Sequence, residues 1–140
     1  MDQNLKREAI LDNYQNPANK GLPTEEGYKQ VNSRNESCVD NITVAAKVTD
    51  GVIEDVKFDG EACAICTSAS SVMTKEMKGK SLEEAELIID NYERMINELP
   101  YEEDVLGELN IYNEVYKQPS RKKCALLPMD SIKKIVEEED

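Results

Sequence analysis

Cysteine is the residue in this chain whose type and spacing could do chemistry. The four cysteines are Cys38, Cys63, Cys66 and Cys124, and Asp40 lies two positions after the first. The chain contains no histidine, so a metal site would have to be built from sulfur and oxygen. Thiolates are soft ligands that suit Zn²⁺ or an iron–sulfur cluster. The cysteines therefore suggest a protein that handles sulfur or an iron–sulfur unit.

Composition narrows the classes of protein to consider. With 140 residues the chain is expected to form one domain, over residues 1–140, with a single core. Its net charge of −12 argues against nucleic acid and anionic lipid as partners, because phosphate groups are bound by basic patches. The first ten residues hold no apolar signal region, and no apolar run approaches the roughly 20 residues of a membrane span. We therefore expect a cytoplasmic protein, whose cysteines serve as metal ligands or reactive thiols rather than in disulfides.

A β-hairpin is the clearest structural element that the sequence predicts. Apolar and polar residues alternate over residues 42–48 and again over residues 52–58, and Asp50-Gly51 between them favours a tight turn. Such a turn brings the two outer strand ends to the same edge of the sheet. Residues 38–40 precede the first strand and Cys63 follows the second, so the hairpin is expected to bring their side chains together.

Helical periodicity and end signals predict five helices. Ser81, with Glu84 three residues later, forms a capping box that opens one of them. The first helix is expected to turn Leu5 and Ile10 toward the core, and residues 16–27 after it carry the Asn, Gly and Pro signals of a loop. The predicted helices cover residues 5–14, 64–78, 82–99, 106–116 and 125–136. The order of helix, strands and then helices predicts an α+β fold, a small antiparallel sheet with helices packed on one face.

Cys124 is expected to reach the same edge from a distant part of the sequence. We place it in a loop between Pro119 and the last helix, from which its thiol could join Asp40 and the other cysteines. Three cysteines and one aspartate would complete a four-coordinate metal site. Cys63 and Cys124 each precede a predicted helix, whose free N–H groups favour the thiolate and lower its pKa. Residues 121–123 add three positive charges beside Cys124.

Each of these residues also has a purely structural interpretation. An isolated cysteine is usually a small buried apolar residue, and Cys66 fits that description best, one helical turn after Cys63. The pair could instead be half of a zinc knuckle, whose second half is missing, or a redox pair, which would follow the first strand of a βαβ unit. Asp40 could equally be a turn or cap residue, and residues 121–123 could form a solvated loop.

Four segments of the chain carry motifs in a recognisable order. They are Tyr14-Gln15-Asn16-Pro17, Ser37-Cys38-Val39-Asp40, Gly60-Glu61-Ala62-Cys63-Ala64-Ile65 and Arg121-Lys122-Lys123-Cys124-Ala125-Leu126. Together they resemble the SufU branch of the IscU/NifU N-terminal family of iron–sulfur cluster assembly proteins, over essentially the whole chain. Two features are similar to the SufU branch rather than to IscU-type scaffolds: no histidine precedes the last cysteine, and 61 positions separate Cys63 from Cys124.

The resemblance implies a set of roles for these residues. The metal ligands would be Cys38, Asp40, Cys63 and Cys124, with Zn²⁺ as the resting metal. A PLP-dependent cysteine desulfurase of the SufS type would carry a persulfide whose terminal sulfur this chain accepts, and a histidine of the desulfurase would replace one ligand and free a cysteine. We expect Cys38 to be that acceptor and Arg121 to steady the displaced thiolate or persulfide. The sulfur would pass on to a downstream iron–sulfur scaffold or to apo-proteins.

The chain departs from the family pattern at three positions near the expected site. Val39 and Ala62 stand where the family has glycine, and Cys66 stands where it commonly has serine. Two rival functions use the same ligands: a scaffold that assembles and transfers a [2Fe–2S] cluster or binds iron, and a structural zinc site that only stabilises the fold. A zinc hydrolase or deaminase is least favoured, because such sites use a motif that contains histidine.

Overall fold

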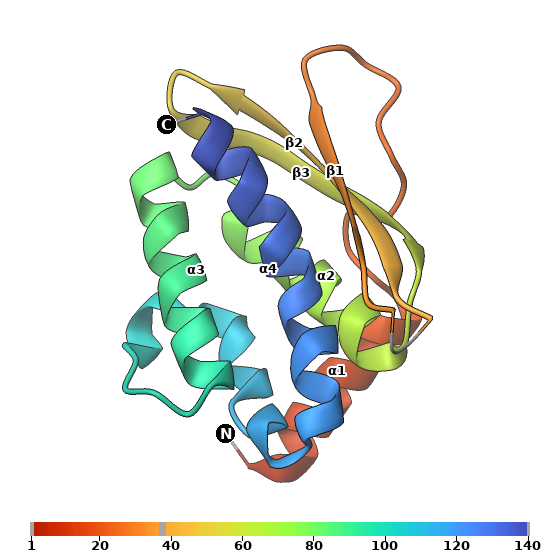
Figure 1. The fold of residues 1–140 in the computed structure, drawn as a ribbon, viewed down its shortest axis with the longest axis vertical. Helices are drawn as coiled ribbons and strands as arrows, with labels where there is room; N and C mark the ends of the chain where they lie inside the picture. Colours follow the sequence, from red (N-terminus) through yellow and green to blue (C-terminus); the bar gives the residue numbers. More distant parts are fainter. Residues whose placement is uncertain (1, 37–38, 140) are drawn as a thin grey trace.

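The sheet consists of three antiparallel strands that lie side by side in chain order. The computed structural model describes residues 2–36 and 39–139, and within them β1 spans Lys29–Arg34, β2 spans Asn41–Thr49 and β3 spans Val52–Glu61 (Figure 1). β2 and β3 form the predicted hairpin. Both residues of its turn, Asp50 and Gly51, have positive φ, as a type I′ turn requires. The prediction of a hairpin is confirmed.

β1 has no counterpart among the predicted elements. Only Ser33 of its six residues is buried and Val31 is half-buried, so no apolar alternation marks the strand in the sequence. Two tertiary interactions define it instead. It pairs with β2, and the hydroxyl groups of Ser33 and Ser131 on the last helix share a hydrogen bond. Pairing with a neighbour, rather than local preference, decides that this segment is a strand.

The α-helices cover one face of the sheet. In the described part of the chain they are α1 (Gln3–Gln15), α2 (Ala64–Met77), α3 (Leu82–Ile96) and α4 (Pro119–Glu139). α2 and α4 pack against the strands, α3 packs against α4, and α1 packs against α2 (Figure 1). Their inner side chains form one continuous apolar cluster with the inner face of the sheet, which includes Val44, Val56, Phe58, Met73 and Ile132. The predicted α+β fold is confirmed.

One predicted helix and one predicted core residue differ from the structure. The segment predicted as a helix over residues 106–116 forms short 3₁₀ turns, at Glu103–Val105, Gly107–Tyr112 and Val115–Lys117. Gly107, with a φ of 52°, lies in this segment. In α1, Leu5 is 51% exposed, so its predicted place in the core is wrong. The buried residue of this helix is the polar Asn13.

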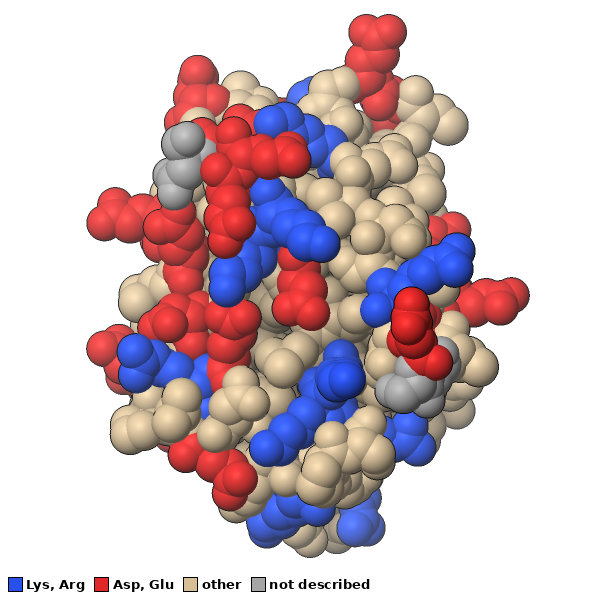
Figure 2. Space-filling view, viewed as in Figure 1, with Lys and Arg blue, Asp and Glu red and all other residues tan. Residues whose placement is uncertain are grey.

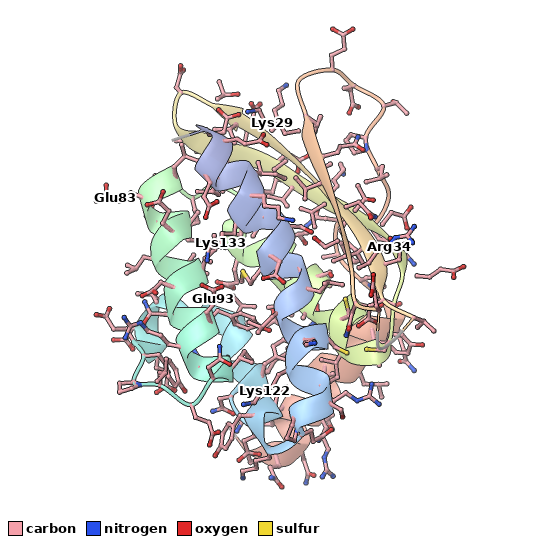
Figure 3. All side chains as sticks on the ribbon, in the orientation of Figure 1. Lys29, Arg34, Glu83, Glu93, Lys122 and Lys133 are labelled. Carbon is pink, nitrogen blue, oxygen red and sulfur yellow. The ribbon has the colours of Figure 1, made fainter. Side chains whose placement is uncertain are left out.

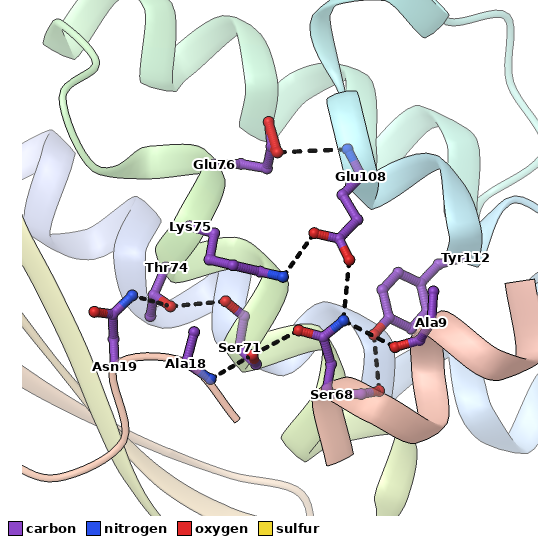
Figure 4. A network of polar contacts seen from close by, with 11 residues as sticks. Ala9, Ala18, Asn19, Ser68, Ser71, Thr74, Lys75, Glu76, Glu108 and Tyr112 are labelled. Carbon is purple, nitrogen blue, oxygen red and sulfur yellow. Dashed lines mark hydrogen bonds and ion pairs between the residues drawn. The ribbon is translucent and has the colours of Figure 1, made fainter. Parts of the chain in front are cut away.

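Asn13 belongs to a hydrogen-bond network that ties α1 and the following loop to α2 (Figure 4). Its side-chain oxygen accepts a hydrogen bond from the Ser71 hydroxyl at 2.8 Å, and its side-chain nitrogen donates to a Glu108 carboxylate oxygen at 3.0 Å. The backbone N–H of Ala18 donates to the same Ser71 oxygen. These contacts satisfy polar groups that would otherwise be buried without partners, and they fix α2 relative to its surroundings. Ser71 of α2 therefore connects this helix to both α1 and the loop after it.

α4 begins earlier than the sequence predicts. The sequence predicts a loop at Cys124, but α4 begins at Pro119, so Cys124 lies in the second turn of the helix. Proline suits the first position of a helix, because its φ is already close to helical and its missing N–H would have no partner there. The capping box of Ser81 and Glu84 at the start of α3 is confirmed. No helix in the described ranges is long and apolar enough to cross a membrane.

Candidate metal centre

Asp40, Cys63 and Cys124 converge at one end of the sheet. One ligand atom of each, a carboxylate oxygen and two sulfurs, lies within 4.8 Å of the other two. Sulfur atoms are visible in Figure 3 where the strand ends meet α2 and α4. Asp40 is 2% exposed and Cys124 is 1% exposed, while Cys63 is half-buried. The predicted convergence of these three side chains is confirmed.

The hairpin register positions Asp40 beside Cys63. β2 and β3 pair at Asn41 and Glu61, so the residues just outside this pair face each other across the sheet end. One oxygen of the Asp40 carboxylate accepts a hydrogen bond from the backbone N–H of Cys63 at 2.8 Å, and the other lies 3.9 Å from its sulfur. Gly60 permits this close approach: a Cβ at that position would stand 2.1 Å from the carbonyl oxygen of Asn41.

Cys63 is the N-cap residue of α2. Its sulfur accepts a hydrogen bond from the backbone N–H of Cys66 at 3.5 Å. This places the sulfur at the positive end of the helix, where negative charge is stabilised. The predicted position of Cys63 just before a helix is confirmed, and its sulfur lies 3.9 Å from an Asp40 carboxylate oxygen.

Cys124 reaches the site from α4 rather than from a loop. Its sulfur accepts a hydrogen bond from the side-chain nitrogen of Asn35 at 3.8 Å. Burial raises the pKa of the Cys124 thiol, and the neighbouring Asp40 and Cys63 raise it further. The predicted lowering of this pKa by a helix N-terminus is wrong, because the residue lies inside the helix. A metal bound here would have to displace the thiol proton, which couples binding to pH.

The donor set fits a soft divalent metal. Ligand atoms around a tetrahedral zinc with bonds of ~2.0–2.3 Å lie about 3.3–3.8 Å apart. The three ligand atoms lie within 4.8 Å of one another, so closing around zinc would need a contraction of at most about 1.5 Å. Two sulfurs and one carboxylate oxygen also fit an iron–sulfur cluster. Cys38, the predicted fourth ligand, lies outside the described residues. Its neighbour Val39 is 71% exposed, beside the buried Asp40.

Cys66 does not join the three converging side chains, among the residues that the structure describes. It is fully buried in α2, and burial raises the pKa of its thiol. Its backbone N–H, rather than its thiol, contacts the site. This arrangement supports the interpretation of Cys66 as a packed core residue.

The basic segment 121–123 points in more than one direction. Lys122 lies between α4 and α3, 4.0 Å from a Glu98 carboxylate oxygen (Figure 3). Lys123 lines a groove of about 460 Å³ together with Arg34, between the end of β1 and α4. Arg121 is exposed one turn before Cys124, and residues three apart share a helix face. Its predicted contact with a displaced thiolate stays a prediction.

Charge is distributed unevenly over the molecule. On the face shown in Figure 2, acidic side chains gather along the side of α3, and lysine and arginine side chains predominate at the lower end, where α4 begins. The net charge of −12 is therefore not spread evenly over this face.

Asn35 is a site residue that sequence reasoning missed. It follows β1, is 6% exposed, and contacts the sulfur of Cys124. No periodicity or motif marks it, because its partner is 89 positions away in the sequence. Only the packing of α4 against β1 brings the two together.

Two known proteins are similar to this chain over most of its length. The chain is 34% identical over 137 residues to "Zinc-dependent sulfurtransferase SufU" of Bacillus subtilis. The aligned region covers 97% of this chain and 92% of the relative. It is 32% identical over 126 residues to "Iron-sulfur cluster assembly scaffold protein IscU" of Thermotoga maritima, covering 90% of this chain and 88% of the relative.

Solved structures show the same fold. A crystal structure of a putative scaffold protein for the SUF system from Fervidobacterium islandicum matches with a TM-score of 0.80 and 30% identity, over 90% of this chain and 92% of that one. A crystal structure of a hypothetical protein matches with a TM-score of 0.89 and 31% identity, over 97% and 99%. The NifU-like N terminal domain matches residues 5–125. With two thiols and a carboxylate gathered at one end of this fold, the chain belongs to the NifU-like N-terminal domain family, whose members include SufU and IscU proteins.

Proposed function

We propose that this protein is a zinc-dependent acceptor of persulfide sulfur in iron–sulfur cluster assembly, and that it acts in the cytoplasm. The observation that carries the proposal is the convergence of Asp40, Cys63 and Cys124 in a chain without histidine. The similarity to a relative named as a zinc-dependent sulfurtransferase, over 97% of the chain, supports it. The sulfur donor would be a PLP-dependent cysteine desulfurase of the SufS type.

The transfer is a thiol–persulfide exchange. The Cys38 thiolate attacks the terminal sulfur of the donor's persulfide, a new S–S bond forms at Cys38, and the donor's own cysteine leaves as a thiolate. No net oxidation or reduction occurs, because one S–S bond replaces another. Asp40, Cys63 and Cys124 keep their places in the site while Cys38 reacts, and Arg121 offers positive charge to the sulfur that becomes exposed. When bound, Zn²⁺ would hold the cysteines as thiolates and shield them from other electrophiles.

A second candidate function is a scaffold for a [2Fe–2S] cluster. The relatives named as IscU scaffold proteins favour it, since they match 90% of this chain at 32% identity in the case of Thermotoga maritima. The same thiolate and carboxylate ligands could hold two irons. Measured metal content separates the two functions, because the first predicts zinc without sulfide and the second predicts iron with sulfide.

The first experiment is the determination of zinc, iron and acid-labile sulfide per chain, on protein purified without oxygen and without added metal. One zinc and no sulfide supports the sulfur acceptor, whereas two irons with two sulfides would replace it by the scaffold. Stimulation of a cysteine desulfurase is then measured for Cys38→Ala, Cys124→Ala and, as the matched control, Cys66→Ser. We expect the first two variants to lose the stimulation and the control to keep it. Equal stimulation by Cys38→Ala would reject Cys38 as the acceptor.

A further inference from the structure

Asn35 connects two of the three converging residues. Its side-chain nitrogen donates to the sulfur of Cys124 at 3.8 Å, and its backbone N–H donates to the carbonyl oxygen of Asp40 at 3.0 Å. The side chain is 6% exposed, so water competes little for the amide. The same residue thus links the segment before β2 to the sulfur on α4.

The chemistry of the amide suits a thiolate that binds metal. A metal-bound cysteine sulfur has lost its proton, so it can only accept hydrogen bonds, and an Asn side chain offers two N–H donors. Hydrogen bonds to charged acceptors are stronger than those between neutral groups. In metal sites, groups that contact the ligands rather than the metal fix ligand orientation and set the electron density that the ligand donates.

We propose that Asn35 is a positioning residue of the metal centre, which holds the Cys124 sulfur toward Asp40 and Cys63 through an N–H···S hydrogen bond. This inference rests on the metal site of the proposed function. The hydrogen bond stabilises the deprotonated sulfur, which favours metal binding, and it lowers the energy of the sulfur electrons that take part in the metal–sulfur transition. Loss of the donor should therefore both weaken metal binding and change the electronic spectrum of the metal–sulfur bond.

The competing explanation is that Asn35 only closes the loop through its backbone. The variant Asn35→Leu separates the two, because leucine keeps the backbone N–H and the branched shape but has no side-chain donor. Asn32→Leu is the matched control on the same segment. The Asn32 side chain donates to Asn41, Ile42 and Thr43 within the sheet, and none of these bonds involves a site residue.

The test uses the full chain loaded with Co²⁺, which reports zinc-type sites through its sulfur-to-cobalt charge-transfer band. We expect the band of Asn35→Leu to move to longer wavelength, and chelator competition to show Co²⁺ and Zn²⁺ binding about 10–100-fold weaker than in the unmodified protein. Asn32→Leu should keep the band and the affinity, even where its thermal stability falls. An unchanged band and affinity in Asn35→Leu would overturn the inference.

Two further outcomes keep the test decisive. If Asn35→Leu does not fold, Asn35→Asp replaces it, because aspartate has the same size and no donor and should shift the band in the same direction. If the unmodified chain binds neither Co²⁺ nor Zn²⁺, the metal site of the proposed function is rejected, and the role of Asn35 with it. If the unmodified chain binds both metals and Asn35→Leu leaves the band and the affinity unchanged, only the positioning role of Asn35 is rejected.

Discussion

Replacing Gly60 with alanine should destabilise the protein and disturb the metal centre together. The new Cβ would lie 2.1 Å from the Asn41 carbonyl oxygen and 2.9 Å from the Ile42 Cα, both of them backbone atoms. Ordinary contact begins near 3.4 Å, so β2 would have to retreat by about 1.3 Å, the difference between 3.4 and 2.1 Å. The φ of Gly60 is 137°, which costs an alanine about 1–2 kcal/mol in addition to about 1–3 kcal/mol for the forced displacement. We expect a loss of about 2–5 kcal/mol in the free energy of unfolding.

The assay is urea denaturation of Gly60→Ala, followed by circular dichroism, with Gly51→Ala as the control. Gly51 also has a positive φ, 74°, but a Cβ there meets no atom within 4 Å, so only the conformational cost of about 1–2 kcal/mol applies. Both changes reduce the entropy of the unfolded chain equally, and the difference between the variants reports the clash. The displaced strand end carries Asp40, so Zn²⁺ affinity should fall in Gly60→Ala and stay unchanged in Gly51→Ala. Equal losses of stability in the two variants would refute the reasoning.

Three further substitutions test other parts of the structure. Tyr92→Phe removes a buried hydrogen bond of 2.8 Å to the carbonyl oxygen of Ala125, next to Cys124. Urea denaturation should show a free energy of unfolding lower by about 1–3 kcal/mol. An unchanged free energy would mean that this carbonyl oxygen finds another partner. The hydrogen bond to Asp55 and burial raise the pKa of Tyr28 from 10.0 to about 12. Its neutral form is favoured in the folded state, so its contribution to stability is complete below pH 10 and is lost as the pH rises toward 12. Tyr28→Phe should flatten that part of the stability curve, measured by urea denaturation between pH 9 and 12, and an identical slope would contradict this. Cys66→Ser places a hydroxyl in the core and should lower the free energy of unfolding by about 1–2 kcal/mol. Zinc per chain, measured by mass spectrometry, should stay the same. Loss of zinc would make Cys66 a ligand.

The parts of the fold that sequence reasoning predicts well are those that depend on neighbouring residues. Alternation of apolar side chains and a turn with two positive φ values determine the hairpin of β2 and β3 almost locally. The capping box joins Ser81 to Glu84, three positions later, and the cap of α2 joins Cys63 to Cys66, also three positions later. Because Asp40 and Cys63 flank the hairpin, their convergence follows from the same local rules.

The parts that sequence reasoning misplaces depend on packing. A proline can follow the end of one helix or begin the next. The residues around Pro119 do not show which of these applies, and the structure shows that it begins α4. β1 becomes a strand only because β2 and α4 lie beside it, since its own residues show no alternation. Leu5 is exposed, whereas Ala9 and Ile10 of α1 pack against the core and Asn13 joins a polar network with α2.

By itself the sequence determined the chemistry that is available to this protein: soft thiol ligands, one nearby carboxylate, no imidazole, and a hairpin that joins the first two parts of the site. Only the tertiary structure decided that Cys124 enters from within α4 and that Asn35 contacts its sulfur. The physical reason is distance along the chain. Ligand type and short-range geometry are properties of neighbouring residues, whereas the approach of α4 to the end of β1 depends on how the whole apolar core packs.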